Sequence, residues 1–350
     1  MDCREGRDMN TPDSDEPRPH QAMGPGHEFD TIRMLMARWG DLAVDIGDDA
    51  AVLPPEGERR RVISTDACVE DAHFRRDWIS PHDIGVRAAA AALSDLAAMG
   101  ARADAVLLAF VVPDVWRASL GDVADGIASV VRASGAKIIG GNMSRGERLS
   151  ITTTAVGSAT GVVARRGALP GDVLVVTGTL GGPGAALRAW NAAGEPTSWA
   201  RDRFAHPVPR LAEGEALARA GAHAMMDISD GLASDARHLA AASGVHLFID
   251  AGALPRGEGV SARDALSSGE EYELLAALPP MAAERLLREW PTRFAIPLTA
   301  IGSVVGPHAG GAIDIGGDLG GDLGDIHAKP HGKSQSGRVE FVSGHDHFSE

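Results

Sequence analysis

Apolar residues recur along this chain with two periods, one typical of helices and one typical of strands. Between Phe29 and Trp39 they follow the helical spacing and predict one helix with a broad apolar face. Ser80 and Pro81 form an N-cap and a first helical residue, so an alanine-rich helix is expected to begin there and to end before Gly100. Short β-like runs separate such helices, which indicates a mixed α/β architecture.

The same alternation continues through both halves and predicts two domains. Residues 167–172 carry turn chemistry and precede a buried-looking strand, so we place the domain boundary after Arg166. In the first half we expect strands at 61–65, 104–112, 137–139 and 150–157 and a helix at 116–134. In the second half we expect strands at 173–177, 224–228, 245–249, 272–277 and 298–304, with helices near 185–193, 208–220 and 231–242.

Two segments lack this patterning. Residues 1–27 hold many Asp, Pro, Gly and Arg and few apolar side chains, so we expect a disordered leader. The N-terminal domain would then span residues 28–166 and the C-terminal domain residues 167–350. A Gly/Asp-rich tract at 306–325 contains Gly-Gly-Asp-Leu twice. Two copies are too few for a stacked repeat, so we interpret this tract as a flexible loop.

Charge and cysteine content exclude several classes of protein. The 350 residues include 33 Lys and Arg against 48 Asp and Glu, a net charge of −15. This balance argues against nucleic-acid binding through phosphate contacts and against a polybasic membrane surface. Cys3 and Cys68 cannot make a disulfide framework or a four-cysteine zinc site. We find no apolar run of about 18 residues and no signal-peptide pattern, so a soluble, cytoplasmic protein is expected.

The most unusual feature of the chain is a set of carboxylates that stand among small or apolar residues. Asp95 lies inside an Ala/Leu helix, where a charge is costly unless it is partnered. Asp227 and Asp230 end an apolar run and begin a helix, where Asp230 or Ser229 could also serve as an N-cap. The plainer readings elsewhere are a turn at Asp48 and Asp49, a cap at Asp66, and a solvated turn at Glu270 and Glu271.

As a set, these carboxylates favour Mg²⁺, which binds hard oxygen ligands together with water and substrate phosphates. Gathered without cations they would repel one another and take up protons, so several ions and a polyphosphate are indicated. The sequence Gly-Gly-Asn-Met-Ser-Arg-Gly at 140–146 would let the backbone approach phosphates, although a plain turn is as good a reading. Arg165 and Arg166 could neutralise phosphate, and His73 is a weaker candidate.

Eight motifs, in order, resemble the thiamine-monophosphate kinases. They are GDDAAVL, ISTDACVEDAHF, ALSDLAAMGA, GGNMSRG, RGALPGD, MDISDGLASD, SGEEYELL and GHDHF, and they cover roughly Glu28 to Phe348. This family belongs to the aminoimidazole ribonucleotide synthetase-like superfamily of ATP-using enzymes. The resemblance implies a two-domain α/β (α+β type) fold, with an N-terminal domain that forms a homodimer and a C-terminal α/β domain.

The resemblance also implies a reaction, the last step of thiamine diphosphate biosynthesis, in which ATP phosphorylates thiamine monophosphate with the help of several Mg²⁺ ions. Catalysis would centre on Asp95, Asp227 and Asp230. The implied Mg²⁺ ligands are Asp49, Ser64, Thr65, Asp66, Asp95, Asn142, Asp227 and Asp230. The implied ATP contacts are Gly141, Asn142, Arg166 and Ser229, and the implied substrate contacts are His73, Glu270 and His345.

The chain departs from the family pattern at three positions. Asn142 stands where the family commonly has an Asp that binds Mg²⁺, which predicts one weaker metal site. His345 replaces a common aromatic residue, and Glu271 replaces an Asp. Two alternatives stay open from the residues. One is another ATP-dependent enzyme of the superfamily, and the other is a nucleotide- or thiamine-phosphate-binding protein without catalysis.

Overall fold

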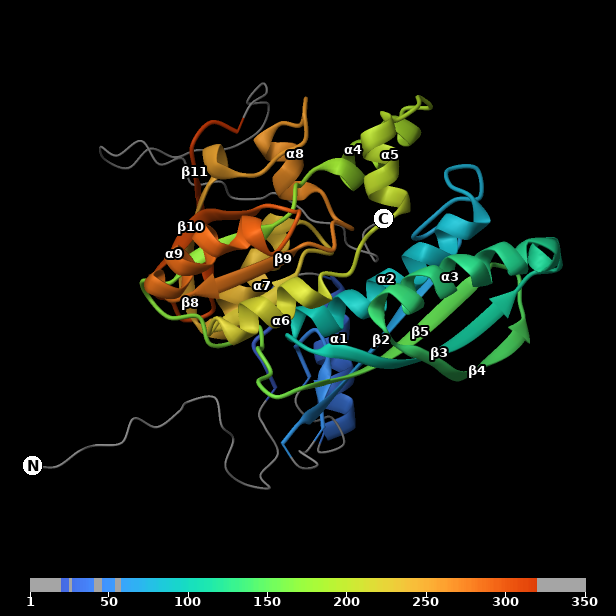
Figure 1. The fold of residues 1–350 in the computed structure, drawn as a ribbon, viewed down its shortest axis with the longest axis horizontal. Helices are drawn as coiled ribbons and strands as arrows, with labels where there is room; N and C mark the ends of the chain where they lie inside the picture. Colours follow the sequence, from blue (N-terminus) through green and yellow to red (C-terminus); the bar gives the residue numbers. More distant parts are fainter. Residues whose placement is uncertain (1–19, 25–26, 41–45, 54–57, 320–350) are drawn as a thin grey trace, which may run out of the picture.

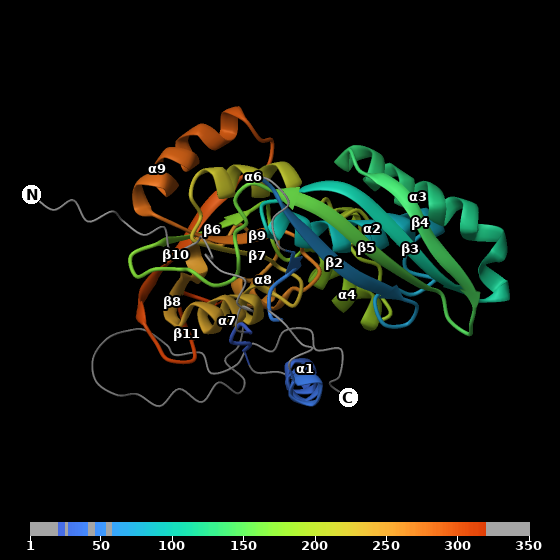
Figure 2. The same cartoon turned by 90° about the horizontal axis from the view of Figure 1, so that it is seen from below.

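Two sheets with their helices make up the described part of the chain (Figures 1 and 2). The computed structural model describes residues 20–24, 27–40, 46–53 and 58–319. The first sheet has the strand order β1-β2-β5-β3-β4, and the second has the order β11-β8-β10-β6-β9-β7. The expected mixed α/β architecture in two halves is therefore confirmed. No helix within the described residues is both long and apolar enough to span a membrane.

The first half is a sheet with helices on one face (Figure 1). Strands β2, β5 and β3 run antiparallel, and β4 pairs with β3 in parallel at the edge. Helices α2 and α3 approach so closely at Gly85 that a Cβ on this residue would lie 2.0 Å from the Val123 carbonyl oxygen. The elements are α1 (His27–Trp39), β1 (Ala51–Val52), β2 (Arg60–Val69), α2 (Pro81–Ala98), β3 (Arg102–Val112), η2 (Asp114–Ser119), α3 (Leu120–Ser134), β4 (Lys137–Arg145) and β5 (Ser150–Ala159).

Helix α2 is the central element of the molecule. Ser80 and Asp83 form a capping box at its N-terminus, and Pro81 occupies the first helical position. Its small alanines let other elements approach from several sides, so most of the helix is buried. It contacts β2, β5 and α3 of the first half and α6 and β7 of the second half. A polar side chain on α2 can therefore reach both halves of the protein.

The second half is a mostly antiparallel sheet in which β11 pairs with β8 in parallel. Strand β7 at one edge of this sheet and its neighbour β9 are buried along their whole length. The elements are β6 (Val173–Thr177), α4 (Gly182–Asn191), α5 (Ser198–Ala205), α6 (Leu211–Arg219), β7 (Ala224–Asp227), α7 (Leu232–Ser243), β8 (Val245–Asp250), η3 (Ala251–Ala253), α8 (Ala262–Ser267), β9 (Leu274–Leu278), α9 (Pro280–Glu289), η4 (Trp290–Thr292), β10 (Leu298–Pro307) and β11 (Ala312–Gly316).

Several local expectations need correction. The helix expected at 116–134 begins only at Leu120, after the 3₁₀ segment η2. The strand expected from residue 272 begins at Leu274, because Tyr272 has a left-handed φ of 52° that a strand does not accommodate. Part of the tract interpreted as a flexible loop forms β11, which pairs with β8, while residues 320–325 lie outside the described residues.

Candidate active site

Three aspartates from separate segments meet where the two halves face each other. Asp49 precedes β1, Asp95 lies near the C-terminal end of α2, and Asp227 ends β7. Oxygen atoms of the three carboxylates lie within 4.8 Å of one another, an arrangement that could hold a metal ion. Because these residues are far apart in sequence, the group forms only when both halves and α2 are assembled.

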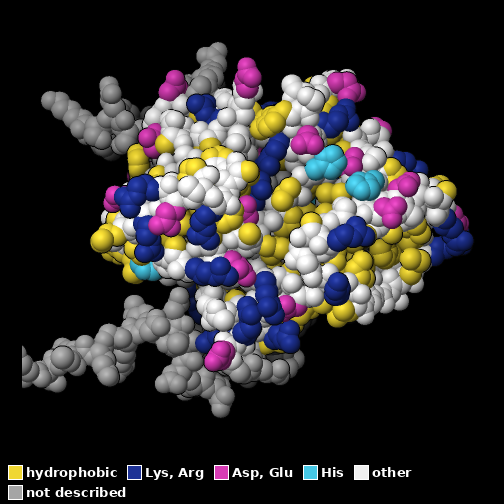
Figure 3. Space-filling view, viewed as in Figure 1, with side chains coloured by type: hydrophobic (Ala, Val, Ile, Leu, Met, Phe, Trp, Pro, Cys, Tyr) yellow, Lys and Arg dark blue, Asp and Glu magenta, His cyan; other side chains and the backbone are white. Residues whose placement is uncertain are grey.

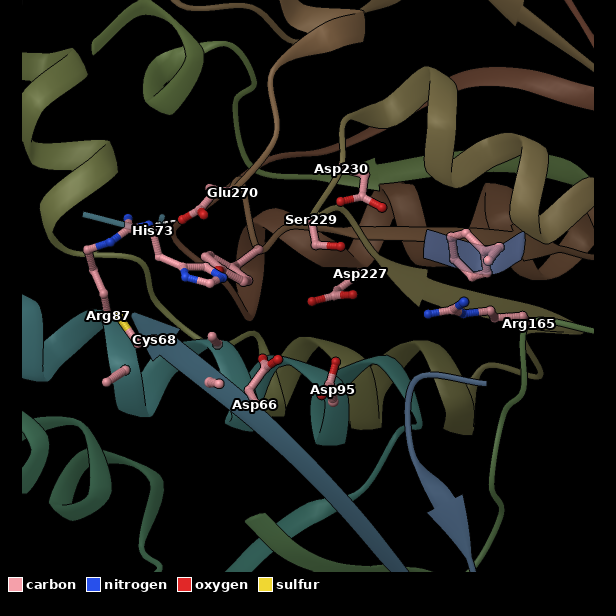
Figure 4. Close-up of a pocket in the computed structure, with 15 residues that line it drawn as sticks. Asp66, Cys68, His73, Arg87, Asp95, Arg165, Asp227, Ser229, Asp230 and Glu270 are labelled. Atoms are coloured by element: carbon pink, nitrogen blue, oxygen red, sulfur yellow. Dashed lines mark ion pairs between the residues drawn. The ribbon is translucent and has the colours of Figure 1, made fainter. Parts of the chain in front are cut away.

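A cavity of about 230 Å³ adjoins this group, and we call it the acidic cavity. Asp66 and Asp95 enter it from the N-terminal half, and Asp227, Ser229 and Asp230 face them from the C-terminal half (Figure 4). With His73, Arg165 and Glu270, which also line the cavity, the fold thus brings together eight of the residues that the sequence singled out. The remaining lining residues are Phe29, Ala67, Cys68, Arg87, Ala88, Ala91 and Tyr272.

Two carboxylates of this site, those of Asp95 and Asp227, are held in an environment that opposes their ionisation. Burial raises the pKa of Asp95 well above its ordinary range, and the neighbouring aspartates raise it further. Burial and repulsion from Asp49 raise the pKa of Asp227 to about 8, although Ser94 donates a hydrogen bond of 2.6 Å to its carboxylate. Ser64 similarly donates to Asp95. Crowded carboxylates of this kind need a cation, and hard oxygen donors suit Mg²⁺, so the residues fit that ion.

Arg165 brings a buried cation to the same site. Its guanidinium pairs with the Asp49 carboxylate at 2.5 Å, and its backbone N–H donates to Asp48 at 3.0 Å. Arg165 lines the acidic cavity, whereas Arg166 is not one of the described lining residues. Both arginines were possible phosphate partners from the sequence, and the family resemblance implied Arg166 as the ATP contact. The position of Arg165 makes it the stronger candidate to face an anionic ligand.

The turn after β7 is organised by a residue that the sequence analysis did not single out. The Asp235 carboxylate accepts hydrogen bonds from the backbone N–H groups of Ser229 and Asp230, at 3.1 and 3.2 Å. Asp235 is 1% exposed and lies in the first turn of α7. A side-chain acceptor that faces two consecutive amides fixes the turn and keeps Asp227 and Asp230 on the same side of it. The signal was present in the sequence as an Asp five residues after Asp230.

The segment before α1 is also part of the site. Gln21 is 6% exposed and donates to Asp48, and the Gly24 N–H donates to Nδ1 of buried His238 at 3.1 Å. Phe29, which lines the acidic cavity, lies over His238 with ring centroids 4.1 Å apart. Residues 20–24 were expected to belong to a disordered leader, and the described structure corrects this. Their contacts are with distant residues, which the local composition does not reveal.

A second, larger cavity of about 510 Å³ adjoins the first, and we call it the aromatic cavity. Its lining includes Trp78 and Phe204, and the two cavities share His73 and Glu270. His73 accepts a hydrogen bond at Nδ1 from the Val69 N–H, so the neutral ring carries its proton on Nε2. Two of the three residues expected to contact the substrate, His73 and Glu270, therefore stand together where the acidic and aromatic cavities adjoin.

Other candidates lie away from the acidic cavity. Gly141 and Asn142 do not form a turn but belong to β4, whose side chains are exposed. Three strand spacings separate β4 from β2, which corresponds to about 14 Å. Thr65 points to the face opposite Ser64, where its hydroxyl lies 3.0 Å from that of Thr154. His345 lies outside the described residues.

Two family models match the chain in tandem. The model for the N-terminal domain of AIR synthase related proteins matches residues 47–161, and the model for their C-terminal domain matches residues 170–315. Together they cover both sheets and the residues of the acidic cavity except Phe29 and Arg165. The boundary between them falls between β5 and β6.

Individual relatives are more specific. A thiamine-monophosphate kinase of Mycobacterium tuberculosis (strain ATCC 25618 / H37Rv) is 40% identical over 63% of this chain and 66% of its own length, slightly less than two thirds. A thiamine-monophosphate kinase of Halobacterium salinarum is 36% identical over 79% of this chain and 93% of its own length. The solved structure of AaThiL complexed with AMPPCP and TMP has a TM-score of 0.73 and 28% identity, and it covers 83% of this chain and 93% of that chain.

Proposed function

This chain belongs to the thiamine-monophosphate kinases among the AIR synthase related proteins, and we propose that it phosphorylates thiamine monophosphate with ATP. The products are thiamine diphosphate and ADP. One observation carries the proposal: carboxylates from both halves converge on a cavity that shares His73 and Glu270 with a neighbouring aromatic cavity. Such a pair of spaces suits an acceptor with a phosphate at one end and aromatic rings at the other.

The proposed reaction needs neither a covalent intermediate on the protein nor a strong base. The acceptor phosphate is already anionic, so an oxygen of thiamine monophosphate attacks the γ-phosphorus without a strong base. The bond from the γ-phosphorus to the β,γ-bridging oxygen breaks, and ADP carries that oxygen away. Catalysis then consists of holding two anions in line and offsetting their repulsion.

Mg²⁺ fits the donor set of the site and would supply the positive charge that brings the two phosphates together. Asp49, Asp95 and Asp227 are the residues we propose to hold it, with Asp66 and Asp230 at the wall of the same cavity. Ser64 and Ser94 orient two of these carboxylates through their hydroxyl groups. These contacts aim the carboxylate oxygens at one place before any substrate arrives.

We place the nucleotide phosphates beside Arg165 and Ser229. Arg165 already faces three carboxylates of the site and can pair with phosphate oxygens in a bidentate manner. The backbone of the Ser229–Asp230 turn is fixed by Asp235, so the Ser229 hydroxyl has a stable position at the cavity wall. The relative complexed with AMPPCP, an ATP analogue, supports a nucleotide in this fold.

We propose a homodimer built on the first sheet. Helices α2 and α3 cover one face of this sheet, while Ile63, Leu107 and Val156 on the other face stay only partly buried. The edge strand β4 exposes Ile138 (48%), Ile139 (61%) and Met143 (62%). Hydrophobic side chains gather over this end of the sheet in Figure 3. A second copy of the chain would bury both surfaces.

A dimer would also give Asn142 a route to a nucleotide. Asn142 lies in the row of paired residues that runs through Ala109 and Thr152 to Ala67 on β2. It is therefore about 14 Å from the β2 end of its own site. If Asn142 contacts ATP or Mg²⁺, we propose that it does so for a site shared with the second copy.

An acceptor series tests the proposed function. The purified protein is incubated with ATP and MgCl₂ and either thiamine monophosphate, thiamine or no acceptor, and ADP and thiamine diphosphate are quantified. We expect one ADP per thiamine diphosphate with thiamine monophosphate, and no turnover with thiamine, which lacks the attacking phosphate. Binding of both ligands without turnover would support a protein without catalysis and would contradict the proposal.

A further inference from the structure

Arg87 is a buried cation whose role none of the preceding contacts explains. It lies on α2, two turns before Asp95, and is 3% exposed. It lines the acidic cavity, where its guanidinium pairs with the Glu270 carboxylate across the junction of the two halves (Figure 4). Burial lowers the pKa of its guanidinium, so the fold holds this charge at a cost in desolvation.

The rest of the guanidinium is also fixed by the C-terminal half. Arg87 donates to the carbonyl oxygen of Phe204, and its Cζ lies 3.7 Å from the centroid of the Phe204 ring. Phe204 is fully buried and packs edge-on against Trp78 and Trp190, which stack on each other at 5.1 Å. Arg87 therefore has one defined position, set by an aromatic cluster that also forms part of the aromatic cavity.

Glu270, its partner, has an unusual backbone. Its φ is 61°, and that of Tyr272 is 52°, both in the left-handed region that non-glycine residues seldom occupy. The Glu270 N–H donates to the Ser229 carbonyl at 2.7 Å, and the Tyr272 N–H donates to the Ile228 carbonyl at 2.9 Å. The strained segment is thus bound to the turn that carries Asp227 and Asp230, and Glu270 is its side-chain contact with α2.

An ion pair of this kind is poorly explained as a device for stability alone. Burying both charges costs desolvation, and a hydrophobic pair of similar size would hold α2 against this loop equally well. A charged pair at the junction of two cavities has a different effect, because it fixes the direction of a carboxylate next to a ligand. The left-handed backbone of Glu270 is a second costly feature at the same junction.

We propose that Arg87 is a positioning residue that holds Glu270 at the junction of the acidic and aromatic cavities and thereby sets the affinity for the acceptor. The inference rests on the proposed function, because it assigns the acceptor to these two cavities. It places Arg87 outside the group that holds Mg²⁺ and ATP. Loss of Arg87 therefore affects thiamine monophosphate more than it affects the nucleotide.

The test compares Arg87→Gln and Arg87→Lys with the natural protein in steady-state kinetics. We expect Arg87→Gln to raise the KM for thiamine monophosphate by at least about tenfold, with the KM for ATP changed by less than about twofold. Arg87→Lys keeps the charge and is expected to recover part of the loss. Arg210→Gln is the matched control, because Arg210 is 8% exposed and pairs with buried Glu273 away from both cavities.

A double-mutant cycle separates positioning from a general loss of structure. Glu270→Gln should also raise the KM for thiamine monophosphate, and adding Arg87→Gln to it should have little further effect. Three results would overturn the inference. They are equal rises in the KM for thiamine monophosphate and for ATP, additive effects of Arg87→Gln and Glu270→Gln, and the same change of KM in Arg210→Gln. If Arg87→Gln unfolds, Arg87→Lys and calorimetric binding of thiamine monophosphate decide the matter. A natural protein without thiamine monophosphate turnover would instead count against the proposed function.

Discussion

Asp95 of α2 and Asp227 at the end of β7 place carboxylates from the two halves of the chain within 4.8 Å of each other. Ser94, which precedes Asp95 on the same helix, donates a hydrogen bond of 2.6 Å to Asp227. One helical step therefore supplies both a carboxylate and the hydroxyl that orients its partner. The site depends on the contact between α2 and the second sheet, and a change at this contact affects chemistry and assembly together.

Replacing Asp95 or Asp227 with Asn should reduce turnover by on the order of 100-fold or more while the fold persists. Asn removes one of the buried carboxylates that repel one another, so the variants should be at least as stable as the natural protein without metal. The stabilisation that MgCl₂ gives to the natural protein should be lost. Thermal unfolding with and without MgCl₂, together with the kinase assay, measures both effects.

Asp172→Asn is the matched control for this pair. Asp172 is 3% exposed and contacts His223 and the Leu169 N–H in the second half, away from the acidic cavity. The Asp172→Asn variant should still turn over and should still be stabilised by MgCl₂, even if its own stability differs from that of the natural protein. An Asp95 or Asp227 variant with full activity would remove that residue from the mechanism.

The homodimer should be visible in sedimentation as a particle of two chains at micromolar concentration. Ile139→Arg on β4 should shift the protein to single chains, because it places a charge in the proposed apolar contact. Met281→Arg is the control, since Met281 is 85% exposed on α9 of the other half. A natural protein that sediments only as single chains would refute the dimer.

Asn142→Asp should lower the Mg²⁺ concentration that gives half-maximal rate, because a carboxylate binds the ion more tightly than an amide oxygen does. The position of Asn142 on β4 adds a condition. The effect should disappear when Ile139→Arg is combined with it, since the proposed shared site then no longer forms. An unchanged Mg²⁺ dependence in Asn142→Asp would mean that this residue does not touch a catalytic metal.

His238 should make stability fall as the solution becomes acidic. Burial, together with the nearby arginines Arg165, Arg237 and Arg33, lowers its pKa from 6.5 to about 3. Below pH 6.5 the unfolded chain binds one proton that the folded chain does not, so unfolding is favoured by about 1.4 kcal/mol per pH unit until the pH approaches 3.

His238→Gln isolates this contribution, because Gln can still accept the Gly24 N–H but does not titrate. Chemical unfolding of both proteins at pH 6.5 and 5.5 gives the comparison. The natural protein should lose more stability than the variant over this interval. Equal losses would mean that His238 is protonated in the fold or contributes nothing to its pH dependence.

Periodicity predicted the elements that carry the site, because their sequences satisfy local rules. Helix α2 shows this. Ser80 and Pro81 predict where it begins, and Asp95, among alanines and leucines, is the residue that the sequence indicates as functional. Local rules fail where contacts between distant segments decide. The Gly-Gly pair at 140–141 suggested a phosphate-binding backbone or a plain turn. A Cβ on Gly141 would lie 1.8 Å from the Leu108 carbonyl oxygen, so this glycine serves the pairing of β4 with β3.

The site was predictable in its residue types but not in its geometry. Asp227 and Asp230 stood out because carboxylates are rare next to runs of apolar residues. Asp235, Arg87 and Gln21 did not, because their importance comes from burial and from partners far away in sequence. The sequence also could not decide between Arg165 and Arg166. Adjacent arginines look alike in sequence, and only the fold determines which of them faces the cavity.

The central claim is that the terminal phosphoryl group of ATP moves intact to thiamine monophosphate. Incubation with MgCl₂, thiamine monophosphate and ATP labelled in the γ-phosphoryl group, followed by separation of the products, measures this directly. The account predicts that the label appears in the terminal phosphate of thiamine diphosphate, in amounts equal to the ADP formed, and that Asp95→Asn slows the transfer by on the order of 100-fold or more. Label found only in inorganic phosphate, or in no product, would contradict it.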